Sequence, residues 1–128
     1  MDDRVKYWLE LSDYDLETAI AMLNSRRYLY VGFLCHQTIE KIFKAYYTFL
    51  TSETAPFSHS LSYLAKKGDF YDEFSEDQKD FIDRIEPLNI EARYPSNKER
   101  LLKSLTYEKC LDIIEKTKAL QQWIKAKL

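Results

Sequence analysis

The apolar positions at the start of the chain repeat with the period of a helix. From about Asp3 to Asn24 they fall three or four residues apart, which places them on one face. These apolar residues are Val5, Trp8, Leu9, Leu16, Ala19, Ile20 and Leu23. Asp13, Asp15 and Glu17 lie largely outside this stripe. The pattern predicts an amphipathic first helix that ends near Asn24.

The next segment, from about Arg27 to about Leu50, is apolar on nearly every side in its first half. A helix of this kind is buried or lies between partners, so we expect it to build the core. Its remaining polar residues follow steps of three and four and therefore share one face. These residues are His36, Gln37, Glu40, Lys41 and Lys44. Glu40 and Lys44 also have the spacing of a favourable i,i+4 ion pair.

Capping residues predict a short helix after this long one. Residues 51–60 contain a proline and are predicted to form a loop. Ser58 or Ser60 then caps a helix from about Leu61 to Lys67, which Gly68 ends.

A second set of signals divides the remainder of the chain. The segment Ser75–Gln78 has the pattern of a capping box at the start of a medium helix. Pro87 is expected to kink or end that helix. The stretch Glu91–Arg100 contains Pro95 and is predicted to be turn or loop. Thr106 is expected to cap a last long helix.

These elements predict an all-α fold, an up-down antiparallel bundle of four to five helices in a single domain spanning residues 1–128. The composition agrees with this fold class. Only 2 glycines are present, too few for the many hairpins of an all-β fold. The chain is 45% apolar and 31% charged, which is ordinary for a globular protein and argues against disorder.

The charge, the hydropathy and the cysteines indicate which classes of partner and which cellular compartment to expect. The net charge of −2 is unsuited to a protein whose whole surface grips nucleic acid, although it leaves room for a local basic patch. No apolar run approaches the roughly 20 residues that span a bilayer. The first residues are charged and do not resemble a signal peptide, so we expect a cytoplasmic protein without membrane contact. Cys35 and Cys110 lie in apolar-rich helical stretches and are interpreted as buried thiols.

Two histidines are the first candidates for chemistry. His36 and Glu40 share a face, and such a pair is half of a metal site or an acid/base pair. The structural interpretation is a polar helix face satisfied by hydrogen bonds. His59 precedes the expected short helix, where it is either part of the cap or a catalytic group. The chain has few further metal ligands, no glycine-rich phosphate loop and no HExxH motif, so we expect neither a metal nor a cofactor.

Arg93 and Tyr94 are the second candidates. The guanidinium of Arg93 either clamps a phosphate or carboxylate or pins its loop to a helix end. Lys98, Arg100 and Lys103 follow closely. Together they form a local basic strip that suits phosphate backbones and base stacking. A solvated charged loop has the same composition.

Taken in order, several of these residues resemble the HEPN domain family, small prokaryotic helical proteins often encoded beside minimal nucleotidyltransferases. The resemblance covers nearly the whole chain. The matching segments are Trp8 with Asp15-Leu16 and Ala19, Arg27-Tyr28 through Phe33 with Gln37, Glu40-Lys41 and Lys44-Ala45, then His59-Ser60-Leu61, and Arg93-Tyr94-Pro95. It implies a bundle of four or five helices that is usually dimeric. Some members are metal-independent ribonucleases, and others pair with a nucleotidyltransferase and have been thought to bind nucleotides or the partner's substrate.

The ribonuclease members of that family carry an arginine and a histidine separated by four to six residues. Neither His36 nor His59 follows an arginine at that spacing. At the shortest spacing after Arg93 the chain has Lys98, which is a poor general acid or base at neutral pH. The motif is therefore absent.

We therefore expect a non-catalytic HEPN-type binding subunit. It would be homodimeric, act with a nucleotidyltransferase-like partner and bind a nucleotide or an RNA phosphate. The expected ligand-binding residues are His36, Glu40, Lys44, Arg93 and Tyr94. The alternative is a divergent, toxin-like, metal-independent ribonuclease that uses Arg93 with His36 or His59. A structural adaptor without a small ligand is a third hypothesis.

Overall fold

The computed structural model describes the backbone of residues 1–91 and 95–128, and all their side chains except those of residues 91, 95–98 and 101. Every regular element in these ranges is helical, which confirms the all-α prediction. The elements are α1 (Asp3–Asn24), α2 (Leu29–Thr51), α3 (Leu61–Lys67), the 3-10 turn η1 (Tyr71–Glu73), α4 (Glu76–Ile85), α5 (Leu88–Glu91), α6 (Pro95–Ser104) and α7 (Tyr107–Lys125). None of the helices in this part of the chain is long and apolar enough to cross a membrane.

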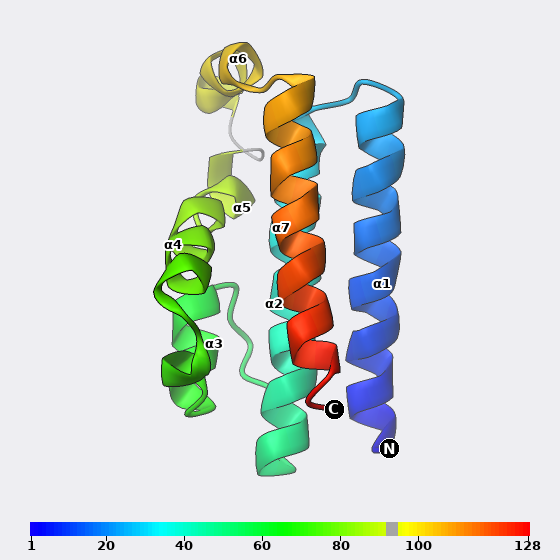
Figure 1. Ribbon diagram of the computed structural model, residues 1–128, viewed down its shortest axis with the longest axis vertical. Coiled ribbons are helices and arrows are strands. Elements are labelled where there is room, and N and C mark those ends of the chain that lie inside the picture. Colours follow the sequence, from blue (N-terminus) through cyan, green and yellow to red (C-terminus); the bar gives the residue numbers. More distant parts are fainter. Residues whose placement is uncertain (92–94) are drawn as a thin grey trace.

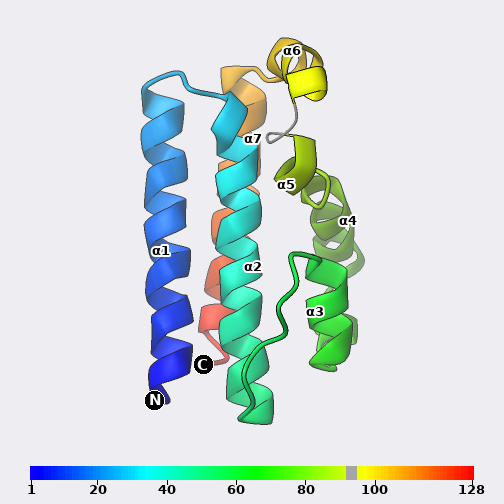
Figure 2. The ribbon, with the colours of Figure 1, turned by 180° about the vertical axis from the view of Figure 1, so that it is seen from behind.

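The helices α1, α2, α4 and α7 run alternately up and down, which confirms the predicted antiparallel bundle (Figure 1). Both chain ends lie at the same end of the molecule. The two opposite views agree that α2 and α7 are central, with α1 on one side and α3, α4 and α5 on the other (Figure 2). The contacts of α2 with α1, α7, α3 and α5 place it at the centre of the fold.

The starts of α3, α4 and α7 follow from capping side chains close to them in the sequence. The hydroxyl of Ser60 accepts a hydrogen bond from the backbone N–H of Tyr63 at the start of α3. Ser75 and Gln78 form the predicted capping box at the start of α4. The Thr106 hydroxyl accepts from Lys109 N–H and begins α7. These caps satisfy N–H groups that the first turn of a helix cannot pair internally.

The prediction at Pro87 is confirmed, whereas the prediction around Pro95 is not. Pro87 separates α4 from the single turn of α5, as predicted. The prediction of turn or loop over residues 91–100 is wrong from Pro95 onward, because α6 begins at that residue. Proline is favoured at the first helical position, where its missing N–H would have had no partner. Proline can therefore follow the end of one helix, as Pro87 does, and begin another, as Pro95 does.

Aromatic packing attaches the α3–α4 side of the bundle to α2. The ring of Phe43, fully buried on α2, lies 5.4 Å from the ring centroids of Phe70 and Phe74. The glycine at position 68, at the end of α3, is not required by the backbone conformation, because its φ of −81° suits any residue. It is required because there is no space for a side chain. An added Cβ there would lie 2.6 Å from Phe70 and 2.9 Å from Tyr47. This tight junction holds the end of α3 and the segment around η1 against α2.

Candidate functional site

A buried carboxylate lies at the centre of the candidate site. Glu40, on α2, is 3% exposed. Its Oε2 accepts a hydrogen bond from Lys44 Nζ at 3.1 Å, and its Oε1 lies 2.9 Å from His59 Nδ1. His36 Nδ1 is 4.0 Å from the same Oε1 atom. One carboxylate therefore connects two residues of its own helix with the histidine that precedes α3.

His36 continues this cluster towards α4. Its ring is fully buried, and its Nε2 lies 3.4 Å from Glu86 Oε2 without the alignment of a hydrogen bond. Both oxygens of Glu86 accept from the backbone N–H of Leu61, at 2.9 and 3.1 Å. Glu86 thus supplies a partner for an N–H at the start of α3 that has none within the helix. The contacts tie α2, α3 and the end of α4 together.

The surroundings of Glu86 lower the pKa of its carboxyl group from the ordinary value of 4.5. Partial burial acts in the opposite direction, because it disfavours the charged form. Polar contacts with the His36 ring, the Leu61 N–H and the Ser60 hydroxyl favour the carboxylate and together outweigh burial. Glu86 is therefore held as an anion beside the histidine.

Replacing Glu86 with glutamine is expected to lower the free energy of unfolding at neutral pH by about 1–2 kcal/mol. The amide keeps the shape of the side chain but loses its charge. Because the folded-state pKa is depressed, the carboxylate's contribution is present above the unfolded value of 4.5 and is lost as the pH falls through the folded value. Urea unfolding of both proteins between neutral and acid pH should therefore converge on the acid side. A difference that does not change with pH would contradict the assignment.

The predicted site residues are partly brought together. His36, Glu40 and Lys44 do meet, and His59 joins them, but the three helix residues are buried in the fold. The His59 side chain is 54% exposed, so it is the member of the cluster that solvent reaches most. The polar face of α2 is therefore an internal network with a histidine at its rim.

Other predicted residues have different environments. Lys41 shares the polar face by its spacing, yet it pairs with Asp15 on α1. The ammonium of Lys44 lies 5.1 Å from the ring centroid of Trp8, also on α1. Arg93 and Tyr94 lie outside the described residues. Glu86 was missed by the sequence analysis, because a glutamate before a proline at a helix end carries no local sign of a contact 25 residues away.

The described residues offer little for metal or thiol chemistry. Within residues 1–91 and 95–128, no three His, Cys, Asp or Glu side chains are arranged to hold a metal ion. Cys35 and Cys110 are both buried. Burial raises the pKa of Cys35 to about 12 and that of Cys110 to about 11. Neither thiol is therefore a nucleophile at neutral pH.

Comparison with known proteins identifies the family. The model of the HEPN domain matches residues 5–127. The chain belongs to the HEPN domain family. Among solved structures, the HEPN chain is similar to TT1696 from Thermus thermophilus, with a TM-score of 0.82 at 18% sequence identity over 99% of this chain and 100% of that one. At this identity the likeness shows the fold alone. No curated protein matches the sequence.

The cluster gives a structural reason for some of the residues that match the HEPN family. Glu40 and Lys44 on α2 and His59 before α3 come from two separate matching segments of the sequence, and they meet around one carboxylate. Leu61, in the second segment, offers its backbone N–H to Glu86. In this HEPN domain the matching residues therefore serve at least to join α2 to α3 and α4.

Proposed function

We propose that this HEPN protein is a non-catalytic binding subunit. It forms a homodimer, acts with a nucleotidyltransferase-like partner and binds a nucleotide or an RNA phosphate. The observation that carries the non-catalytic part is the burial of His36, which is 0% exposed. A general acid or base must reach the proton that it transfers. His36 is enclosed by Glu40, Glu86 and Gln37 instead.

The proposed ligand surface keeps the residues expected from the sequence but divides their roles. His36, Glu40 and Lys44 are buried and position the exposed His59 rather than contact the ligand. His59 contacts the ligand from the exposed end of the cluster. Arg93 supplies the charge for a phosphate and Tyr94 a stacking ring.

Exposed aromatic side chains support the proposed homodimer and partner. Phe57 is fully exposed and lies two residues before His59, and Tyr63 is exposed on α3. Large apolar side chains beside a polar site are typical of surfaces that another protein covers. We propose that this region near His59 forms part of such an interface.

Sedimentation equilibrium tests the assembly, and an RNA incubation tests the absence of catalysis. At tens of micromolar we expect a species of twice the 15.3 kDa chain mass. We expect no cleavage of structured or single-stranded RNA, and binding of a nucleotide or RNA that is weakened by Arg93→Ala. A monomer at that concentration, or binding unaffected by Arg93→Ala, would count against the proposal.

One observation favours the ribonuclease alternative. Glu40 holds the Nδ1 side of the His59 ring at 2.9 Å while the ring remains exposed to solvent. A carboxylate that orients a histidine is the usual arrangement for a general acid or base. RNA cleavage that disappears in both His59→Ala and Arg93→Ala would establish this alternative in place of the binding subunit.

A further inference from the structure

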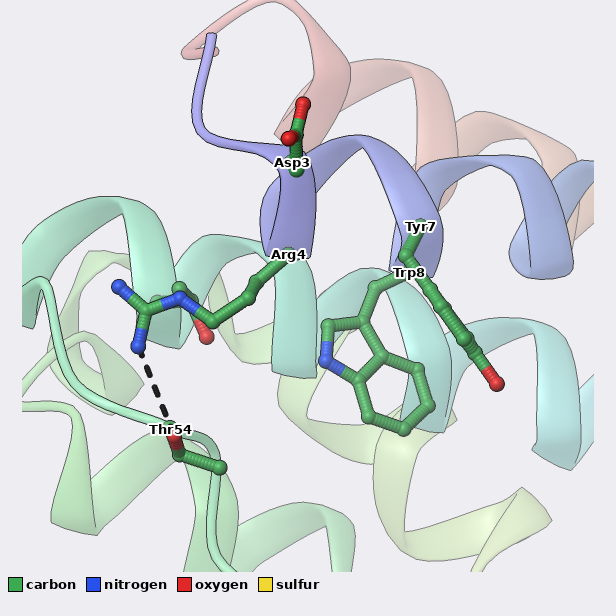
Figure 3. A pocket seen from close by; sticks show the side chains of 6 residues that line it. Asp3, Arg4, Tyr7, Trp8 and Thr54 are labelled. Atoms are coloured by element: carbon green, nitrogen blue, oxygen red, sulfur yellow. Dashed lines mark hydrogen bonds between the residues drawn. The ribbon is translucent and has the colours of Figure 1, made fainter.

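A hollow of about 480 Å³ lies at the end of the bundle, where its lining residue Trp8 borders the Lys44 end of the His59 cluster. Its size is in the range of small-molecule sites. The start of α1, the last turns of α2 and the loop that follows form its walls. The lining residues are Asp3, Arg4, Tyr7, Trp8, Thr48 and Thr54. Figure 3 shows Arg4 and Thr54 on one side of the hollow and the Tyr7 and Trp8 rings on the other.

The wall formed by Arg4 is fixed in place. Its guanidinium donates to the Asp2 carboxylate at 2.8 and 3.2 Å and to the backbone oxygen of Ser52 at 2.9 Å. It also lies 3.5 Å from the Thr54 hydroxyl. These contacts join the start of α1 to the end of α2. The hollow is therefore present before any ligand arrives, which limits the ordering cost of binding.

The aromatic wall is suited to a flat, neutral ring. The Tyr7 and Trp8 rings lie 5.2 Å apart and are tilted by 55°. The buried Lys44 ammonium, 5.1 Å from the Trp8 ring centroid, already interacts with the indole as a cation. Glu40 pairs with the Lys44 ammonium at 3.1 Å, and an aromatic ring can stack on the indole beside this pair.

Polar groups around the aromatic wall offer both donors and acceptors. The indole N–H of Trp8 forms no hydrogen bond to any residue that the structure describes. It points to the side of the hollow where Arg4 and Thr54 lie (Figure 3). Thr54 contributes a hydroxyl, whereas Asp3 lines the edge of the hollow and its carboxylate points away from Trp8 and Thr54 (Figure 3). A heteroaromatic ring with ring-nitrogen acceptors and an amino donor matches this set.

The charges at the hollow disfavour a phosphate. Among the described residues that line it, Arg4 carries the only positive charge, and Asp2 already pairs with that charge. Asp3 adds a negative charge beside it. A nucleotide phosphate would therefore meet two carboxylates and one neutralised guanidinium.

We propose that this hollow binds the base of a neutral purine nucleoside, stacked on Trp8. The hollow is lined by none of His59, Arg93 or Tyr94, although Lys44 connects Trp8 to the buried part of the proposed phosphate-binding surface. Stacking on the indole gives the affinity, and the Trp8 N–H and the Thr54 hydroxyl orient the base.

The fluorescence of Trp8 tests the site directly. In the Trp123→Phe variant Trp8 is the remaining tryptophan, and it is titrated with adenosine, AMP and choline. We expect saturable quenching by adenosine at a Kd of millimolar or below. AMP is expected to bind about threefold or more weakly because of the two carboxylates. Choline has no aromatic ring to stack on the indole and is expected to bind more weakly than adenosine.

A matched pair of tyrosines on α1 controls for surface effects. Tyr7 lines the hollow and is 52% exposed, whereas Tyr14, two turns further along, is 66% exposed and does not line it. Tyr7→Ser should weaken adenosine binding about fivefold or more, and Tyr14→Ser should leave it unchanged. Both variants should fold, as thermal unfolding will verify, since both side chains are exposed.

Three outcomes would overturn the proposal. These are no saturable quenching at up to about 5 mM adenosine, equal affinities of the Tyr7→Ser and Tyr14→Ser variants, and tighter binding of AMP or choline than of adenosine. Arg93→Ala separates this site from the proposed function. That change should weaken phosphate-dependent binding and leave the adenosine titration unaltered.

Discussion

Replacing Glu40 with glutamine is expected to lower the free energy of unfolding by about 3–5 kcal/mol, the usual cost of removing one partner from a buried ion pair. Glu40 is the carboxylate that faces the buried Lys44 ammonium, and glutamine would leave that charge without a counter-ion. A domain of this size is stable by only about 5–15 kcal/mol in total. The loss should be plain in urea unfolding followed by circular dichroism.

Two further variants show whether the unpaired charge causes this loss. The double variant Glu40→Gln, Lys44→Met removes both charges and is expected to recover more than half of the lost stability, because an apolar side chain needs no counter-ion. Asp112→Asn removes a carboxylate that forms an exposed pair with Arg84 and another with Lys116. Solvent screens both pairs, so their loss should cost less than about 1 kcal/mol. If Glu40→Gln were no more costly than Asp112→Asn, the cluster would not be an organising element of the fold.

The helices of this protein could be predicted because their signals are local. Ser60 and Thr106 cap through hydrogen bonds to residues three positions ahead, and helical periodicity also involves near neighbours. Pro95 was misassigned for a related reason. A proline restricts the chain in the same way at a helix start as in a turn, so its own neighbourhood does not distinguish the two.

The site could be predicted less completely, because its geometry depends on distant contacts. Helical spacing places His36, Glu40 and Lys44 on one face, but their burial depends on other elements that pack against α2, including Trp8 of α1 over Lys44. Glu86 reaches the site through a backbone N–H 25 residues away. Lys41 has the spacing of the cluster and pairs with α1 instead. The predicted role of Arg93 and Tyr94 in the ligand surface stays a prediction.

The aromatic junction beside the cluster leads to a second large effect. Phe43→Ala is expected to lower the free energy of unfolding by about 3–5 kcal/mol, through lost burial and the cavity that remains. The Phe43 ring lies against Phe70 and Phe74, and Phe74 in turn lies 5.4 Å from the Trp123 ring on α7. The neighbours are rigid rings held by other contacts, so they cannot collapse fully into the space. Chemical denaturation measures the loss.

The position of Phe43 gives this change a consequence for the site as well. Because Phe43 anchors η1 and the start of α4 to α2, its loss should loosen the approach of His59 and Glu86 to Glu40 and His36. We expect the His59 ring signals in proton NMR to move towards those of a free histidine. Phe49→Ala is the matched control, since Phe49 lies on the same helix and is 46% exposed. It should cost less than about 1 kcal/mol and leave the His59 signals in place. If both variants left the His59 signals unchanged, the loop before α3 would be held by its own contacts with Glu40 and Glu86, and the aromatic junction would contribute stability without positioning the site.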